Sequence, residues 1–374
     1  MKPDLIMKLA RDEIKNLKPC VHGGELWKYY PNHWNILDFS VNVNPLSLPR
    51  KVMEAVERSL SQIQFYPDPD SSALRNAISN YLEGISPENV IVGNGSTELI
   101  YLFCDVFIKS GDEAIIPIPT FGEYENAVIK AGGIPKYVKL DEDFKVNPDT
   151  LLKEIGPRTK VIFLCNPNNP TSTIIPKDDL FKIIEDSDRR NVLVLMDEDF
   201  IEFVDEDISM VGEVKNYKNL FILRSFTKIF GLTGLRVGYG VACEEIISLL
   251  FKGKIPWNVN CIAQAAAIAA LQDVEYLEET RKLIREEREF LLDELKRIHG
   301  LRVFPAHANF ILIDIRQTGF TAAQLKEAML KHGILIRDCS SFKGLDEYYI
   351  RVAVRTRHEN ERLLAALRSV IGDS

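Results

Sequence analysis

The sequence predicts an α/β protein in which a large domain, built on a mostly parallel seven-stranded sheet, is followed by a smaller α+β domain. Short apolar, β-branched runs alternate with longer amphipathic segments, which is the pattern of parallel strands covered by helices. After about Pro256 the character changes and helical segments dominate. The chain has 374 residues, enough for two or three domains at roughly 100–200 residues each.

Seven strands are expected in the large domain, because seven short runs are rich in apolar and β-branched residues. They lie at 90–92, 114–117, 136–139, 160–165, 192–196, 220–223 and 237–241. Amphipathic segments between them predict helices at 97–108, 124–131 and 177–188. The alternation of the two patterns is the reason for expecting a parallel sheet.

The last third of the chain predicts helices at 263–271 and 274–299, the second of which is long enough to bridge two domains. Then follow a strand at 309–314, a helix at 321–332, strands at 334–337 and 348–354, and a helix at 359–370. We therefore divide the chain into an N-terminal arm at 1–44, a large domain at 45–272 and a small domain at 273–374. The arm is expected to contribute to the small domain and to the active site.

Composition excludes several classes of protein. With 46 basic and 54 acidic residues the net charge is −8, which argues against a nucleic-acid-binding protein. No apolar run approaches the ~18–20 residues of a membrane helix, and the N-terminus has no secretory signal. The six cysteines are scattered without a C-x-x-C pair, which indicates reduced thiols in a cytoplasmic protein and no metal site.

Polar residues follow three of the expected strands. Lys228 comes shortly after the run at 220–223, and it is either a loop lysine or a lysine that forms a Schiff base. Asp197 ends the run at 192–196, where a carboxylate either points into the ligand crevice of an open α/β sheet or caps a turn. The N-P-N-N-P-T loop at 166–171 is held rigid by its two prolines.

Two further groups suit anions. The Gly-Asn-Gly-Ser-Thr turn at 93–97 lies between a strand and a helix, so its backbone can approach a phosphate closely. It lacks the dinucleotide-binding pattern and the Walker lysine, and it suits one phosphate better than a pyrophosphate. Arg337 and Arg351 stand at strand positions, and they are either surface charges or a pair that holds a carboxylate and a phosphate.

Together these residues describe a site for pyridoxal 5′-phosphate. Lys228 would hold the cofactor as a Schiff base, Asp197 would keep the ring nitrogen protonated, and Asn169 would bind the ring hydroxyl. Phe121 is placed to stack on the ring face. The expected ligands of the cofactor phosphate are Ser96, Thr97, Ser225 and Arg236, with Thr227 beside them.

The segments N-P-N-N-P-T, D-E-D-F and S-F-T-K-(x7)-R, in this order and spacing, resemble the fold-type I superfamily of aminotransferases. The resemblance runs from about His22 to the C-terminus. It implies a homodimer in which Tyr66 reaches the neighbour's cofactor phosphate; the alternative is a turn tyrosine packed over prolines. Ser172 stands where most members have glycine and is expected to affect the loop geometry. Some members serve as regulatory domains and are normally fused to a DNA-binding module. This chain is acidic and shows no such module.

Two subfamilies are similar, the threonine-phosphate decarboxylases of adenosylcobalamin biosynthesis and the histidinol-phosphate aminotransferases. Phe200, where such aminotransferases usually have tyrosine, and the H-G-G segment at 22–24 favour the decarboxylase. We therefore expect decarboxylation of O-phospho-L-threonine to 1-aminopropan-2-yl phosphate, with the aminotransferase as the alternative. By the resemblance, the residues that contact the phosphorylated substrate are His22, Gly23, Asn42, Asn169, Arg337 and Arg351.

Overall fold

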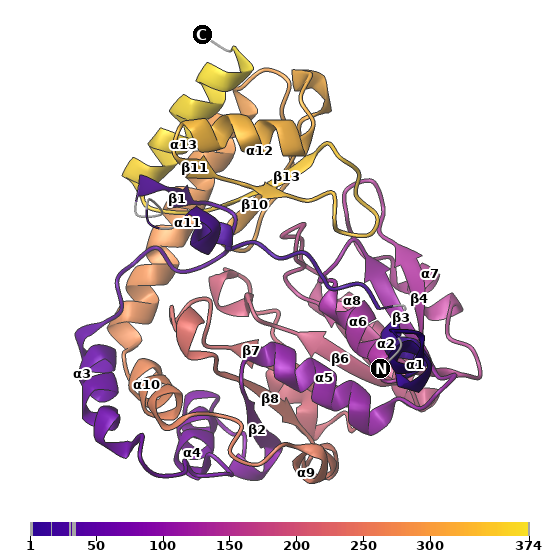
Figure 1. The fold of residues 1–374 in the computed structure, drawn as a ribbon. Helices are drawn as coiled ribbons and strands as arrows, with labels where there is room; N and C mark the ends of the chain where they lie inside the picture. Colours follow the sequence, from indigo (N-terminus) through magenta and orange to yellow (C-terminus); the bar gives the residue numbers. More distant parts are fainter. Residues whose placement is uncertain (1–2, 16, 30, 32–34, 373–374) are drawn as a thin grey trace.

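The computed structural model describes residues 3–15, 17–29, 31 and 35–372. Its centre is a seven-stranded sheet in the order β2-β8-β7-β6-β5-β3-β4 (Figure 1). Strand β8 is antiparallel to both of its neighbours, and the other pairs are parallel. The predicted fold class and the seven predicted strands are confirmed. The strands are β2 (Val90–Gly93), β3 (Glu113–Ile118), β4 (Ile134–Lys139), β5 (Thr159–Cys165), β6 (Leu193–Asp197), β7 (Leu220–Ser225) and β8 (Gly238–Ala242).

The central strands are buried on both faces of the sheet, which is why their sequences are apolar almost throughout. In β6, Val194 and Met196 belong to one apolar cluster, and Leu195 belongs to a second cluster on the opposite face. This alternation follows from the pleat of a strand, which turns successive side chains to opposite sides. Helices must therefore cover both faces.

One face of the sheet is covered by α5, α6 and α9, and the other mainly by α7 and α8. Helices α3 and α4 both pack on α10, and α4 also contacts β2 (Figure 1). The bounds of these helices are α3 (Arg50–Ser59), α4 (Ser72–Tyr81), α5 (Ser96–Phe107), α6 (Glu123–Lys130), α7 (Pro148–Lys153), α8 (Lys177–Arg189), α9 (Glu244–Gly253) and α10 (Cys261–Leu271).

The C-terminal part contains a second, four-stranded sheet in the order β12-β13-β10-β9, which is antiparallel throughout. Three helices accompany it, and α11 runs from the α10 side of the large sheet up into this part (Figure 1). The elements are α11 (Val274–Lys296), β9 (Arg302–Val303), β10 (Phe310–Asp314), α12 (Ala322–Lys331), β12 (Arg337–Asp338), β13 (Tyr349–Ala353) and α13 (Arg357–Ile371).

The single strand predicted at 334–337 is wrong, because the segment is divided between two sheets. Strand β11 (Ile334–Leu335) pairs in parallel with β1 (Leu37–Asp38) of the N-terminal arm, whereas β12 pairs with β13. The backbone N–H groups of Leu37 and Phe39 donate to the carbonyls of Gly333 and Leu335, each at 2.8 Å. The arm therefore supplies a strand to the C-terminal part.

Helix α11 forms hydrogen bonds and an ion pair with two segments that lie on either side of it in the sequence. The Arg288 guanidinium donates to the Phe203 carbonyl at 3.1 Å and to the His307 carbonyl at 2.8 Å. It also forms an ion pair with Asp205 at 2.8 Å. Helix α11 thus ties the segment after β6 to the segment before β10.

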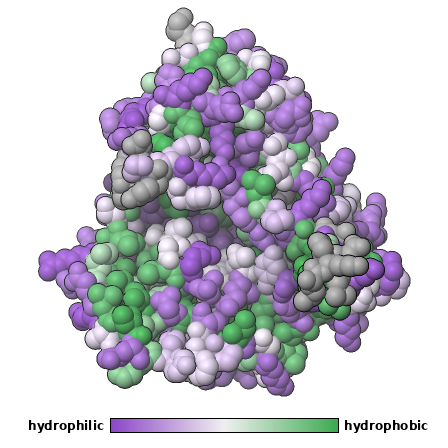
Figure 2. All heavy atoms as spheres, in the orientation of Figure 1, coloured by the Kyte–Doolittle hydropathy of each residue, from purple (hydrophilic) through white to green (hydrophobic). Residues whose placement is uncertain are grey.

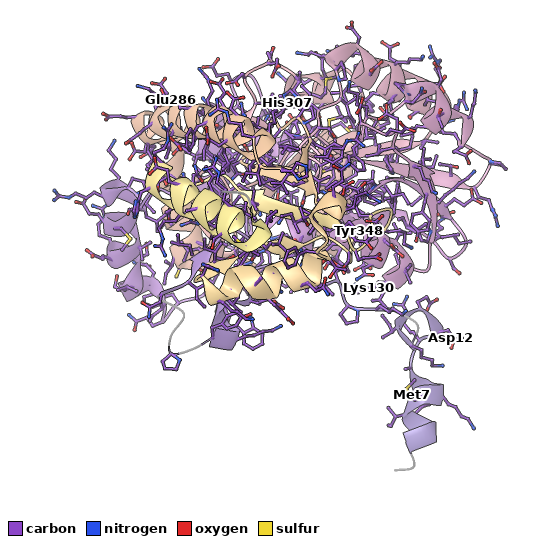
Figure 3. The ribbon with its side chains drawn as sticks, turned by 90° about the horizontal axis from the view of Figure 1, so that it is seen from above. Met7, Asp12, Lys130, Glu286, His307 and Tyr348 are labelled. Carbon is purple, nitrogen blue, oxygen red and sulfur yellow. The ribbon has the colours of Figure 1, made fainter. Side chains whose placement is uncertain are left out.

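The N-terminus forms two short helices, α1 (Pro3–Leu9) and α2 (Asp12–Lys15). Figure 3 shows Met7 and Asp12 on a segment that projects from the body of the molecule. Arg11 anchors the segment by donating to the Lys130 carbonyl of α6 at 2.7 Å. Within the described residues, none of the helices is long and apolar enough to cross a membrane.

Candidate active site

The carboxyl ends of β5, β6 and β7 lie side by side, because these strands are neighbours in the sheet and run parallel. The Asn166 N–H, at the start of the loop after β5, donates to the Asp197 carbonyl at the end of β6 at 2.8 Å. Strand β7 ends at Ser225, and Lys228 follows three residues later. The fold therefore brings three predicted polar segments to one edge of the sheet, where α/β proteins bind ligands.

Asp197 is buried, and both of its oxygens accept hydrogen bonds. The Tyr124 hydroxyl donates to Oδ2 at 2.6 Å, and the Asp199 N–H donates to Oδ1 at 3.0 Å. Burial, followed by the charge of the Asp199 carboxylate, raises the pKa of Asp197. Sequence reasoning missed Tyr124, although it lies one helical turn after Phe121 and their rings meet edge to face at 5.6 Å.

The half-buried Lys228 side chain places its amine beside an aromatic ring. Its Nζ is 5.2 Å from the centre of the Phe200 ring, and burial lowers the pKa of the amine. The carboxylates of Asp199 and Asp197 oppose that effect, because they favour the charged ammonium. A lysine with a lowered pKa is more often neutral and therefore nucleophilic.

The turn before α5 forms a cradle that suits an anion. Gly95 has φ of 85°, and a Cβ built there would lie 2.6 Å from a terminal nitrogen of Arg236. Helix α5 begins at Ser96, so its first N–H groups and its dipole face the same space as this guanidinium. Thr97 lies in the same first turn, and it is half-buried.

Two hydroxyls beside Lys228 are already paired with each other. Ser225 Oγ and Thr227 Oγ1 are 2.6 Å apart, and both residues are buried. Arg236 is exposed and donates to the Thr233 carbonyl at 3.2 Å. The Ser96 hydroxyl donates to Asp199 Oδ2 at 2.9 Å, a partner that sequence reasoning missed.

Hydrogen bonds fix the loop after β5 and leave the Asn169 side chain beside Arg351. Asn168 accepts from the Thr120 hydroxyl at 2.7 Å and donates to the Pro119 carbonyl at 2.9 Å. Ser172 has φ of 61°, a conformation that favours glycine. Its hydroxyl accepts from the Ala308 N–H at 2.8 Å, a bond that glycine could not make.

A cavity of about 90 Å³ gathers most of the residues predicted to bind substrate. Arg351 donates to Asn169 Oδ1 and, at 3.0 Å, to the Ser40 carbonyl. Arg337 donates to the Val21 carbonyl of the arm at 2.5 Å. A second cavity of about 600 Å³ shares a wall with the first. The lining residues that were predicted from the sequence are His22, Gly23, Phe121, Asn169, Arg337 and Arg351.

His22 pairs with a carboxylate that sequence reasoning did not identify. Its Nε2 is 2.7 Å from Oε1 of Glu123, and the Tyr101 hydroxyl donates to the other oxygen at 2.6 Å. The hydrogen bond from His22 is the largest influence on the pKa of Glu123, which is lowered. Gly23 lies so close to Ser40 that a Cβ would be 2.4 Å from its carbonyl oxygen.

Two predicted residues stand apart from this group. Asn42 is buried and is absent from the cavity lining, and its Oδ1 has no hydrogen-bond partner among the described residues. Tyr66 is 80% exposed and stacks on Trp257, with ring centroids 4.6 Å apart. The fold of one chain therefore does not bring Tyr66 into the cavity.

The donors present fit a phosphorylated pyridine aldehyde. A helix N-terminus and a guanidinium converge on a cradle too tight for a Cβ at Gly95, which suits a phosphate. The Lys228 amine, whose pKa is lowered by burial, suits the aldehyde, and a buried carboxylate at Asp197 suits the ring nitrogen. Two shielded atoms, Arg351 Nε and Asp199 Oδ1, have no partner within the described chain and are available to a ligand.

Comparison with known proteins agrees with this geometry. The family model "Aminotransferase class I and II" matches residues 35–367. A histidinol-phosphate aminotransferase of Methanocaldococcus jannaschii is 36% identical over 98% of this chain and 99% of its own length. One from Methanosarcina mazei is 38% identical over 96% of each chain. The crystal structure of the Clostridium acetobutylicum histidinol-phosphate aminotransferase has a TM-score of 0.84 and 33% identity, and it covers 91% of this chain and all of that one.

These relatives correct the expectation of a threonine-phosphate decarboxylase, and with it the assignment to cobalamin biosynthesis. The structure of such a decarboxylase from Porphyromonas gingivalis has a TM-score of 0.80 but only 28% identity, covering 90% of this chain and all of that one. Phe200 had favoured the decarboxylase. Its ring packs edge-on against Phe310 at 4.9 Å and beside the Lys228 amine. Such packing does not select which substrate bond is broken.

The family match extends from the N-terminal arm through the whole central sheet to the last helix, which is far more than half of the chain. It includes the lysine, the strand-end aspartate and the phosphate-like cradle described above. Members of this family carry out their chemistry with pyridoxal 5′-phosphate. The chain therefore belongs to the class I and II aminotransferase family and is an enzyme that depends on pyridoxal 5′-phosphate.

Proposed function

We propose that the enzyme is a histidinol-phosphate aminotransferase, which exchanges an amino group between histidinol phosphate and 2-oxoglutarate. The observation that carries this proposal is the pair of buried guanidiniums, Arg337 and Arg351, in one cavity beside Asn169. One substrate carries a phosphate and the other carries carboxylates, and forked guanidiniums bind both kinds of group. The full-length likeness to two histidinol-phosphate aminotransferases supports the same assignment.

The residues at the strand ends hold the cofactor. Pyridoxal 5′-phosphate, when bound, withdraws electrons from a bond at the amino-bearing carbon of the substrate. Lys228 binds the cofactor aldehyde, Asp197 pairs with the ring nitrogen, Asn169 donates to the ring oxygen and Phe121 covers one ring face. The ligands of the cofactor phosphate are Ser96, Thr97, Ser225, Thr227 and Arg236.

The substrate enters between the arm and the C-terminal part. Arg351 and Arg337 hold its anionic ends, while His22 and Gly23 line the same cavity. Asn42 lies outside that lining. Lys228 would move a proton at the amino-bearing carbon, and burial, which lowers the pKa of its amine, favours the neutral form that acts as a base. The arm at 1–44, the cofactor-binding domain at 45–272 and the small domain at 273–374 thus each contribute to one site.

A homodimer completes the site. Exposed apolar side chains gather in the segments 60–66 and 255–257, where six of them are 47–80% exposed. Figure 2 shows apolar residues gathered over the region of α3, α4 and α10. An exposed patch of this kind marks a protein interface. Tyr66, which lies in the patch, reaches the cofactor phosphate of the partner protomer.

The proposal is tested by incubating the purified enzyme with histidinol phosphate and 2-oxoglutarate and measuring glutamate. We expect glutamate in molar balance with the consumed 2-oxoglutarate and none from the Lys228→Ala variant. Arg337→Ala should lower kcat/KM for histidinol phosphate by about 100-fold, because a charged hydrogen bond contributes about 1.5–3 kcal/mol and the phosphate makes at least one. Arg337→Lys is the matched control, because lysine keeps the positive charge but lacks the paired N–H donors of the guanidinium. Glutamate from other amino donors but not from histidinol phosphate would refute the proposed substrate.

A further inference from the structure

A buried carboxylate, Glu123, is bonded to a histidine of the cavity and has no assigned role. It belongs to the first turn of α6, and its side chain is 11% exposed. Its Oε1 is 2.7 Å from His22 Nε2, and its Oε2 accepts from the Tyr101 hydroxyl of α5 at 2.6 Å. His22 lines the cavity that also holds Arg337 and Arg351, whereas Glu123 does not. Glu123 is therefore placed to act on a ligand in that cavity through His22 rather than by touching the ligand.

The Glu123 carboxylate is held in place and favoured in its charged form. Helices α5 and α6 pack against each other, so the Tyr101 hydroxyl reaches Glu123 from a neighbouring helix. The hydrogen bond from His22 lowers the pKa of Glu123, against the opposing effect of burial. Lys130 lies over the Tyr101 ring at 5.3 Å, but it pairs with Asp105 at 3.0 Å. Among the described residues, His22 is the only basic side chain that forms an ion pair with Glu123.

The backbone on both sides of His22 is held by separate hydrogen bonds. Arg337 donates to the carbonyl of the preceding residue at 2.5 Å, and the Gly24 N–H donates to the Ser40 hydroxyl at 3.1 Å. These bonds keep His22 at the cavity, but they do not fix the rotation of its ring. Because the His22 side chain is 53% exposed, packing does not fix that rotation either. The bond to Glu123 therefore decides which ring nitrogen is left for the cavity.

With Nε2 bonded to Glu123, Nδ1 is the ring nitrogen of His22 that remains for a ligand. In an imidazolium both nitrogens are donors, and an adjacent carboxylate favours this charged form of a histidine. The Nδ1–H group can then donate to an anion while Nε2–H stays bonded to Glu123. The same cavity, of about 90 Å³, holds the guanidiniums of Arg337 and Arg351. Its lining therefore suits an anionic group with donors on several sides.

We propose that Glu123 is a positioning residue that acts through His22: it holds Nε2 of the imidazole so that Nδ1 donates to the substrate phosphate in the cavity. This inference rests on the proposed function, which places the phosphate of histidinol phosphate there. Tyr101 supports the arrangement, because its hydroxyl binds the carboxylate oxygen that His22 does not use. The arm and α6 thereby cooperate in recognising the phosphate.

The first test is a double-mutant cycle on the holoenzyme, with histidinol phosphate and 2-oxoglutarate as substrates. Glu123→Gln keeps the length of the side chain and its ability to accept from Tyr101, and it removes the charge. We expect this variant to raise KM for histidinol phosphate about 3- to 10-fold with little change in kcat, a coupling within the range of residues in contact. His22→Ala should raise KM about 10-fold or more, because a charged hydrogen bond to the phosphate is lost. In the His22→Ala background, Glu123→Gln should have no further effect.

Two variants serve as controls for the cycle. Glu125→Gln removes a carboxylate from the same helix, but one that pairs with Lys343 at 2.7 Å, so KM should stay at the wild-type value. Tyr101→Phe keeps the Glu123 charge and loses one hydrogen bond to it, so KM should lie between those of the wild type and Glu123→Gln.

The second test needs no turnover. Nitrogen NMR of the histidine-labelled enzyme, loaded with pyridoxal 5′-phosphate, reports on both ring nitrogens of His22, and the His22→Ala spectrum identifies their signals. Adding inorganic phosphate should shift the Nδ1 signal in the wild type and have a much weaker effect in Glu123→Gln.

The inference is overturned if the effects of Glu123→Gln and His22→Ala on KM multiply independently, or if folded Glu123→Gln keeps the wild-type KM and the wild-type response to inorganic phosphate. If the wild type makes no glutamate from histidinol phosphate, the proposed function fails instead. The response of the His22 signals to inorganic phosphate then still tests the positioning by Glu123, so the two failures are distinguished.

Discussion

Replacing Tyr124 by Phe removes one hydrogen bond from the carboxylate proposed to pair with the cofactor ring. The Tyr124 hydroxyl donates to Asp197 Oδ2 at 2.6 Å, and both side chains are buried. The phenyl ring would keep its packing on Phe163, whose centroid is 5.3 Å away, and on Phe121. The substitution therefore isolates the contribution of the hydroxyl.

The size of the effect follows from the strength of a charged hydrogen bond. Such a bond stabilises a carboxylate by about 1.5–3 kcal/mol. At about 1.36 kcal/mol per pKa unit, its loss raises the pKa of Asp197 by about 1–2 units. A neutral Asp197 cannot pair with a protonated ring, so the variant should bind pyridoxal 5′-phosphate about 10- to 150-fold more weakly near neutral pH.

The stability of the folded protein and its cofactor affinity depend on pH in opposite directions in this variant. Burial already raises the pKa of Asp197 in the folded protein, so the folded state keeps this proton to a higher pH than the unfolded state does. The resulting stability is fully present below the unfolded pKa of about 3.9 and is lost as the pH rises through the folded pKa. Because Tyr124→Phe raises the pKa of Asp197 further, the variant should lose this stability at a higher pH than the wild type does. Its affinity for pyridoxal 5′-phosphate should approach the wild-type affinity as the pH rises, because Asp197 then becomes charged.

The assay is a titration of the apoenzyme with pyridoxal 5′-phosphate, followed by absorbance at several pH values. Tyr101→Phe is the matched control, because its hydroxyl also donates to a carboxylate at 2.6 Å, but to Glu123 rather than Asp197. We expect the control to keep wild-type cofactor affinity. The reasoning is refuted if Tyr124→Phe shows the affinity and pH profile of the wild type.

Two further predictions concern the cradle and the dimer. Gly95→Ala should weaken the binding of pyridoxal 5′-phosphate, because its Cβ would displace the exposed Arg236 guanidinium, whose terminal nitrogen lies 2.6 Å away. Gly111→Ala is its control, with φ of 88° and open space around the Cβ; both variants carry the backbone strain of about 1–3 kcal/mol, and equal cofactor affinity in the two would contradict a role for the cradle. Mixing inactive Lys228→Ala protomers with Tyr66→Phe protomers should restore part of the activity, and no recovery after verified subunit exchange would argue against a shared site.

The sequence by itself determined the elements and the chemistry-bearing segments. The central strands of the large sheet are recognisable because burial on both faces demands an apolar run, a property that needs no knowledge of the neighbouring strands. The same holds for the glycine turn before α5 and for the polar residues that end β6 and follow β7. These features depend on a few consecutive residues, so a local pattern suffices to predict them.

Tertiary structure decided which distant groups meet. Tyr124 and Asp197 are 73 residues apart, and Arg337 meets Val21 across 316 residues. The segment at 334–337 is divided between two sheets because β1 of the arm pairs with its first half, and no pattern within the segment specifies that partner. The residue type at Phe200 likewise led to the wrong reaction, because the bond that breaks depends on how the substrate is held in three dimensions, which one residue type does not specify. Such contacts arise from the packing of whole elements, so a local sequence pattern does not predict them.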